Sequence, residues 1–193
     1  GCLIAKNQPV KADVFILAVP TPLEKNREGL PNPNIDYVLN AVNSITDFLE
    51  PGNLIILEST SPVGTTEKIA DLIYKKSGIP RDLLSIAYCP ERVLPGKALE
   101  EIIFNSRVVG GVNDESSIQV EKFYKSFCKG EVIKTNSRTA ELVKLSENAY
   151  RDVNIAFANE ISMVSSQLKV DYKEVIKIAN YHPRVNILKP GCG

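Results

Sequence analysis

Short apolar runs that alternate with longer segments of helical spacing most constrain how this chain can fold. The first run, residues 13–19, is too short for a helix and ends at Pro20-Thr21-Pro22, so it predicts a buried strand. A polar stretch rich in turn formers, residues 23–33, is expected to be a loop. In residues 34–49 apolar side chains recur every three or four positions, which predicts an amphipathic helix.

The same alternation continues to residue 135. It predicts strands at residues 53–58, 83–89, 106–112 and 131–135, and helices at residues 65–76, 97–104 and 114–129. Strands that are apolar throughout are typical of a parallel sheet with helices on both faces. The expected fold class is therefore α/β, with a doubly wound (Rossmann-like) parallel sheet.

A different segment begins at Ser137. Residues 137–168 contain neither Gly nor Pro, which predicts one unusually long helix with Ser137 as its cap, followed by a shorter helix at residues 172–179. We place a domain boundary near residue 136, giving domains 1–136 and 137–193. A helix of this length normally packs against several partners, so we expect a homodimer formed through residues 137–168.

Composition excludes several classes of function. Lysine and arginine balance aspartate and glutamate at 23 each, so no broad basic surface is expected to bind nucleic acid or a membrane surface. No apolar run is long enough to cross a membrane. The four cysteines, at positions 2, 89, 128 and 192, form no CxxC pair, and His182 is the only histidine, so no metal site is expected. Scattered thiols favour a cytoplasmic location.

The Gly-rich turn that usually opens a dinucleotide-binding domain is not in the sequence. Such a domain begins with a strand, a G-x-G-x-x-G turn and a helix, and no G-x-G-x-x-G occurs here. Two interpretations stay open at this point. Either the sheet is incomplete because its first βαβ unit precedes residue 1, or the domain is flavodoxin-like and never had that turn.

Polar residues collect where the strands end, which is where ligands bind in parallel sheets. After the second strand, hydroxyl groups and free backbone N–H groups lead directly into a helix and could receive an anion or a ribose. Alternatively, Ser61, Thr65 and Thr66 cap that helix. We favour capping for Thr65 and Thr66, and a ligand contact for Thr60.

The loop after the third strand pairs a carboxylate with a cation, Glu91-Arg92, between Pro90 and Pro95-Gly96. An ordinary surface ion pair would contribute little, whereas a loop shaped by prolines favours a functional site.

The long helix carries a polar stripe. Lys144, Asn148 and Arg151 are spaced i, i+4 and i+7 and so share one face. This is either a buried polar site or a solvated face, and the neighbouring Glu141 and Glu147 are compatible with the second reading. Further along, His182-Pro183-Arg184 is suited to bind an anion or a polar substrate.

Taken together, these motifs resemble one family, the NAD-dependent nucleotide-sugar 6-dehydrogenases that act on UDP-glucose, GDP-mannose or UDP-N-acetylmannosamine. The landmarks occur in order along the whole chain: Val19-Pro20-Thr21-Pro22, Glu58-Ser59-Thr60 through Gly64-Thr65-Thr66, Pro90-Glu91, Glu141-Leu142-Val143-Lys144-Leu145 with Asn148-Ala149, and Pro190-Gly191-Cys192-Gly193. Residues 89–96 and 182–186 resemble the UDP-N-acetylmannosamine branch, because the UDP-glucose branch has Phe and Leu where this chain has Arg92-Val93.

The resemblance implies an oxidation of the sugar's C6 alcohol to a carboxylate, with NAD as cofactor and a cysteine that traps the intermediate aldehyde. By the same resemblance, Lys144, Asn148, Glu91 and Thr60 are expected to be catalytic, and Pro20, Thr21, Thr60 and Glu91 to bind the cofactor. The residues expected to bind the UDP-linked sugar are Arg92, Val93, Lys144, Asn148, Arg151, His182 and Arg184.

The resemblance also has a departure. The family's nucleophilic cysteine follows a Gly-rich loop, which places it beyond residue 193, so Cys192 is not assigned as catalytic and the chain alone is expected to be inactive. Two rival functions stay open: a non-catalytic dimerisation or binding module, and a β-hydroxyacid-type dehydrogenase.

Overall fold

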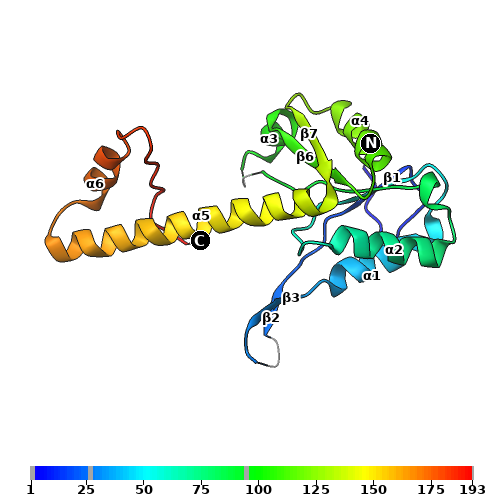
Figure 1. Ribbon diagram of the computed structural model, residues 1–193, viewed down its shortest axis with the longest axis horizontal. Helices are drawn as coiled ribbons and strands as arrows, with labels where there is room; N and C mark the ends of the chain where they lie inside the picture. Colours follow the sequence, from blue (N-terminus) through cyan, green and yellow to red (C-terminus); the bar gives the residue numbers. More distant parts are fainter. Residues whose placement is uncertain (1–2, 26–27, 94–95, 193) are drawn as a thin grey trace. The chain divides into compact units, whose positions relative to one another are not determined.

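The computed structural model describes residues 3–25, 28–93 and 96–192 (Figure 1). Three residues named in the sequence analysis, Cys2, Pro95 and Gly193, lie outside these described ranges. The chain divides into two compact units, residues 1–144 and 145–193. Within the described ranges, no helix combines the length and the apolar character that a membrane span requires.

A five-stranded sheet forms the framework of the first unit. Its order is β1-β4-β5-β6-β7, with bounds β1 Val14–Leu17, β4 Leu54–Leu57, β5 Ser85–Tyr88, β6 Arg107–Gly111 and β7 Val132–Asn136. Strands β1, β4 and β5 are parallel, with Phe15 opposite Ile55 and Ile55 opposite Ile86. The predicted α/β fold with a mostly parallel sheet is confirmed.

The sheet is not parallel throughout, however. Strand β6 runs antiparallel to β5, and β7 runs parallel to β6. The connection from β5 passes through the short helix α3 (Ala98–Phe104), and the chain re-enters the sheet at Arg107, beside the carboxyl end of β5. The expectation of an all-parallel sheet is therefore wrong at this one pair.

Helices cover both faces of the sheet. Helices α1 (Asp36–Ile45) and α2 (Thr65–Ser77) lie on one side and α4 (Asp114–Lys125) on the other, as Figure 1 shows. Side chains alternate between the two cores along each strand. Ile55 and Leu57 belong to the core under α1 and α2, whereas Ile56 belongs to the core under α4. Two 3-10 turns, Thr46–Phe48 and Arg81–Leu83, complete these connections.

The segment expected to be a loop at residues 23–33 contains a small hairpin instead. Strands β2 (Leu23–Lys25) and β3 (Pro31–Pro33) pair antiparallel, and all their residues are exposed. The prediction failed because this ribbon buries no face, so the period-two pattern that identifies a strand is missing.

The long helix is present with its predicted bounds. Helix α5 spans Ser137–Leu168, and α6 spans Tyr172–Ala179. The expected cap is wrong, because Ser137 is buried and the side chain of Asn136 accepts the hydrogen bond from the N–H of Thr139 at 2.8 Å. Close packing fixes the start of α5 on the sheet: a Cβ on Gly110 would lie 2.6 Å from the Cβ of Ala140.

Candidate functional site

The carboxyl ends of β1 and β4 are tied together by two hydroxyl groups. Ser59 accepts a hydrogen bond from the N–H of Val19 at 2.8 Å and donates one to the carbonyl of Val19 at 2.7 Å. The Thr21 hydroxyl donates to the carbonyl of Thr60 at 2.7 Å. The predicted cofactor residues Pro20, Thr21 and Thr60 therefore lie at one edge of the sheet.

A buried carboxylate occupies the N-terminus of α2. The carboxylate of Glu141 accepts hydrogen bonds from the N–H of Gly64 at 2.6 Å, the N–H of Thr66 at 2.8 Å and the hydroxyl of Thr66 at 2.6 Å. Its exposed fraction is 0%. The solvated-face reading of Glu141 is wrong, and these two N–H groups are not free to receive an anion.

The hydroxyl groups of Ser61 and Thr65 donate to backbone carbonyl groups and do not accept from the N–H groups of α2. Thr65 donates to the carbonyl of Pro62 at 2.7 Å, and Ser61 donates to the carbonyl of Ser59 at 2.9 Å. Both side chains shape the loop between β4 and α2. The expected capping by Ser61, Thr65 and Thr66 is therefore wrong: the N-cap is Gly64, and the Glu141 carboxylate accepts from the N–H groups at the start of α2.

Helix α5 also contacts the loop that follows β5. The ammonium group of Lys144 donates to the carbonyl of Glu91 at 2.7 Å. The Glu91 carboxylate accepts a short hydrogen bond from the N–H of Val93, which curls the loop back on itself. The side chain of Arg92 donates to the carbonyl of Ser106 at 3.0 Å. Two predicted catalytic residues, Lys144 and Glu91, are thus in direct contact.

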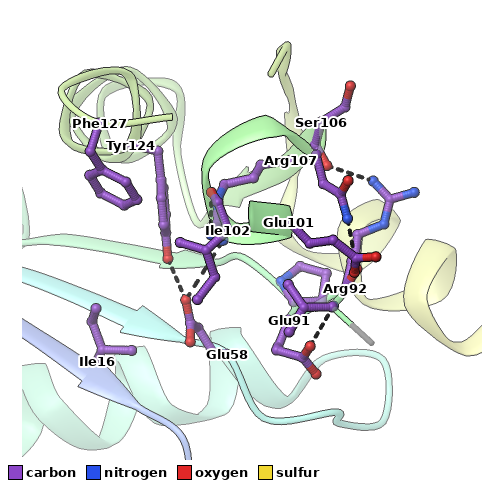
Figure 2. A pocket seen from close by; sticks show the side chains of 13 residues that line it. Ile16, Glu58, Glu91, Arg92, Glu101, Ile102, Ser106, Arg107, Tyr124 and Phe127 are labelled. Carbon is purple, nitrogen blue, oxygen red and sulfur yellow. Dashed lines mark hydrogen bonds and ion pairs between the residues drawn. The ribbon is translucent and has the colours of Figure 1, made fainter. Parts of the chain in front are cut away.

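A cavity of about 250 Å³ opens beside this loop (Figure 2). The predicted residues Glu91, Arg92 and Val93 line one side of it. The other side is formed by β1, the end of β4, and helices α3 and α4. Its lining there includes Ile16, Glu58, Ile102, Arg107, Tyr124 and Phe127.

A buried polar cluster within this lining had not been predicted. The Tyr124 hydroxyl donates to Glu58 Oε1 at 2.8 Å, and the guanidinium carbon of Arg107 lies 4.5 Å from the centre of the Tyr124 ring. No atom in the described ranges accepts a hydrogen bond from the buried Arg107 Nε. Burial raises the pKa of the adjacent Cys89 thiol to about 11. Cys89 is therefore a protonated thiol at neutral pH and is unsuited to nucleophilic attack.

Tyr124 is itself perturbed by this environment. Its pKa is raised, chiefly because burial disfavours the charged phenolate. The tyrosine therefore acts as a hydrogen-bond donor toward Glu58. No local pattern marked these residues, because Arg107 and Tyr124 each occupy an ordinary position in a strand or a helix.

The remaining predicted site residues belong to the second unit. Asn148 and Arg151 are exposed on α5, and His182 and Arg184 are exposed after α6. His182 Nδ1 accepts a hydrogen bond from the N–H of Arg184 at 3.3 Å, which forms a tight turn. All four of these side chains are thus open to solvent in the second unit.

Two asparagines hold the segment that follows α6. Asn159 donates to the carbonyl of Gly191 and accepts from its N–H, both at 2.9 Å. Asn180 bonds to both backbone groups of Ile187 in the same way, at 3.0 and 2.7 Å. Each side-chain amide thus pairs with the backbone N–H and C=O of one residue, as a neighbouring strand would. Neither asparagine had been singled out in the sequence, since single asparagines in or near helices carry no periodic signal.

These features define a class of protein: a Rossmann-like nucleotide-binding domain whose strand-end loops meet the first turns of a long helix. Among the residues that the structure describes, no group of three or more His, Cys, Asp or Glu side chains is placed to hold a metal ion. Comparison with protein families makes the assignment specific. Residues 3–128 match the NAD binding domain, and residues 138–193 the central domain, of the UDP-glucose/GDP-mannose dehydrogenase family. The chain belongs to this family.

Individual relatives agree with this assignment. The chain is 48% identical over 201 residues to a UDP-N-acetyl-D-mannosamine dehydrogenase of Campylobacter jejuni, covering 100% of this chain and 49% of that protein. A UDP-D-ManNAc dehydrogenase structure from Pyrococcus horikoshii superposes with a TM-score of 0.88 at 43% identity, over 95% of this chain and 43% of the other. The Cap5O UDP-N-acetyl-mannosamine dehydrogenase of Staphylococcus aureus has a TM-score of 0.85 at 43% identity, over 96% and 45%.

These comparisons decide between the earlier interpretations. The chain spans about half the length of the curated relatives that it matches. The match to an NAD binding domain selects the dinucleotide-binding interpretation over a flavodoxin-like one and agrees with NAD as the expected cofactor.

Proposed function

We propose that this chain forms part of an NAD-dependent dehydrogenase that oxidises the C6 alcohol of UDP-N-acetylmannosamine to UDP-N-acetylmannosaminuronate. The observation that carries the proposal is the contact between Lys144 and the Glu91 carbonyl. It brings a cation from α5 to the sheet edge where a doubly wound fold binds dinucleotides. Relatives at 43–48% identity that bear the name of this activity support the choice of sugar.

The residues present fit a dinucleotide at the ends of β1 and β4. Thr21 and Thr60 are partly buried there and linked by a hydrogen bond, so the edge is already shaped before any ligand arrives. The N-terminus of α2 does not fit a pyrophosphate, because Glu141 already bonds to the Gly64 and Thr66 N–H groups. Bound NAD would accept the hydride that leaves the sugar's C6.

The chain's own residues then have the following roles. The Lys144 ammonium group stabilises the negative charge that develops on the reacting oxygen, and it exchanges a proton there. Asn148 assists as a second donor. Thr60 and Glu91 orient the nicotinamide or the hydrolytic water, and Pro20 and Thr21 contact the cofactor. The sugar nucleotide is bound by Arg92, Val93, Arg151, His182 and Arg184, in addition to Lys144 and Asn148.

We also propose a homodimer formed through residues 137–168. Large apolar side chains remain exposed along α5 at helical spacing, among them Tyr150, Val153, Phe157 and Val164. Such a stripe on a helix is suited to pack against a second copy. We further propose that residues 1–136 and 137–193 form separate domains and that the protein is located in the cytoplasm.

An assay of the protein that the complete gene encodes tests the activity. We expect NADH formation with UDP-N-acetylmannosamine, at two NADH per sugar, and much slower turnover with UDP-glucose or GDP-mannose. Lys144→Ala should lower turnover by roughly 10²-fold or more, as expected for the loss of an electrostatic or acid/base group. Unchanged turnover in this variant would favour the non-catalytic module. The 193-residue chain alone should show no sustained NADH production.

A further inference from the structure

Glu141 is the most deeply buried carboxylate for which the proposed chemistry has no use. Its exposed fraction is 0%, and it comes from the second turn of α5. All three of its hydrogen bonds go to the loop between β4 and α2, more than seventy residues earlier in the chain. The carboxylate therefore joins two elements that are distant in sequence.

Three hydrogen-bond donors surround the buried Glu141 carboxylate. Burying a charge is unfavourable unless hydrogen bonds replace the lost water, and here three donors do so. Two of these are backbone N–H groups at the start of α2, where the helix dipole also favours negative charge. The bonds therefore hold α5 firmly against α2 at this point.

Lys144 follows Glu141 by three residues, so the two side chains leave neighbouring parts of the same helical surface. Glu141 bonds to the loop that carries Thr60, and Lys144 bonds to the loop that carries Glu91. One turn of α5 thus links the strand-end loops of β4 and β5. Gly110 of β6 approaches Ala140 closely, and this contact holds the start of α5 against the sheet.

We propose that Glu141 is a positioning residue: its carboxylate locks the rotation and height of α5 against α2, and this lock places the Lys144 amine at the Glu91 loop. That this placement of Lys144 matters for catalysis rests on the proposed function. The placement of Lys144 is a structural claim and can be tested without turnover.

The test uses the 193-residue chain with Glu141→Gln and, as a matched control, Glu67→Gln. Glu67 also joins α2 to the start of α5, through an ion pair with Arg138 at 2.8 Å, but it lies at the surface. Acylation of each lysine by an amine-specific reagent is followed by peptide mass spectrometry, with Lys75 on α2 as internal standard. Circular dichroism verifies that each variant is folded.

In Glu141→Gln we expect the Lys144 acylation rate to rise roughly threefold to tenfold relative to Lys75, since the amine is no longer held at the Glu91 carbonyl. In Glu67→Gln the ratio should not change. An unchanged Lys144 ratio in folded Glu141→Gln would overturn the proposal. If that variant does not fold, Thr66→Val removes one of the three bonds and should give a smaller rise; no rise in folded Thr66→Val would then overturn it.

Turnover of the protein that the complete gene encodes separates this inference from the proposed function. If Glu141 positions Lys144, Glu141→Gln should lower kcat with little change in the KM for NAD, and it should alter the pH profile of kcat. A changed Lys144 acylation ratio in a protein without dehydrogenase activity would support the positioning role and contradict the function. An unchanged Lys144 acylation ratio in a protein with dehydrogenase activity would contradict the positioning role and leave the proposed function intact.

Discussion

The Tyr124 hydroxyl donates a 2.8 Å hydrogen bond to Glu58 Oε1, which joins helix α4 to the carboxyl end of β4 (Figure 2). Arg107 lies against both residues, with its guanidinium 4.5 Å from the tyrosine ring and its NH1 4.0 Å from the same carboxylate oxygen. This cluster supports the inner side of the cavity next to the Glu91 loop. Tyr124 is buried and the side chains of Arg107 and Glu58 are largely so, and Arg107 also donates to the carbonyl of Ile102 at 3.3 Å.

Replacing Tyr124 by phenylalanine should destabilise the fold. The ring packing is retained, but Glu58 loses its closest donor, and a partly buried carboxylate with one donor fewer costs about 1–3 kcal/mol. Urea unfolding followed by circular dichroism measures the change in free energy. The control is Tyr37→Phe, because Tyr37 is 51% exposed on α1. Equal unfolding midpoints for both variants would contradict the buried role of the Tyr124 hydroxyl.

The cysteines should differ sharply in their reaction with iodoacetamide. Burial raises the pKa of Cys89 to about 11, so at pH 8 almost none of it is thiolate, and its side chain is also inaccessible. Cys192 is exposed. Peptide mapping at pH 8 should find Cys192 alkylated and Cys89 protected, with Cys89 labelling rising as the pH approaches 11. Rapid labelling of Cys89 at pH 8 in the folded chain would show that this assignment is wrong.

Replacing Asn159 by aspartate should loosen the segment near Gly191. The carboxylate keeps an acceptor for the Gly191 N–H but loses the donor to the Gly191 carbonyl, and it places negative charge beside that oxygen. Hydrogen exchange of residues 187–192 should accelerate severalfold. Asn154→Asp is the matched control, because the Asn154 side chain donates to the carbonyl of Tyr150 in its own helix. Equal exchange in the two variants would speak against the Asn159 clamp.

Replacing Gly110 by alanine should strain the contact between β6 and α5. The added Cβ would lie 2.5 Å from the carbonyl oxygen of Asn136 and 2.6 Å from the Cβ of Ala140, and neither atom is at the end of a flexible side chain. Overpacking of this kind costs about 1–3 kcal/mol. The thermal midpoint measures it against Gly191→Ala, since a Cβ at Gly191 would meet no atom of the described part of the chain within 4 Å. A midpoint like that of the control would indicate that α5 shifts without strain.

Local periodicity was sufficient to locate most elements. The bounds predicted for the two last helices, 137–168 and 172–179, agree with those of α5 and α6. Both segments have the helical spacing of apolar side chains and lack internal Gly and Pro. The same reasoning did not find the exposed hairpin of β2 and β3, because it buries no face.

The candidate site was predicted in part. Thr21, Thr60, Glu91 and Lys144 were singled out, and the structure brings these four to the strand ends of the first unit. Arg107 and Tyr124 were not, and Glu58 was named only as part of a family landmark, because the importance of these three residues comes from contacts across the fold.

The sequence by itself determined the succession of the five strands of the main sheet and of the helices, the extent of the long helix and the family, because these depend on local spacing and on motifs in series. Only the tertiary structure decided the direction of β6 and the burial of Glu141. A strand has the same pattern in either direction, and its direction depends on where the chain re-enters the sheet. Whether a glutamate on a helix is solvated depends on what lies opposite it, and for Glu141 that is the N-terminus of α2.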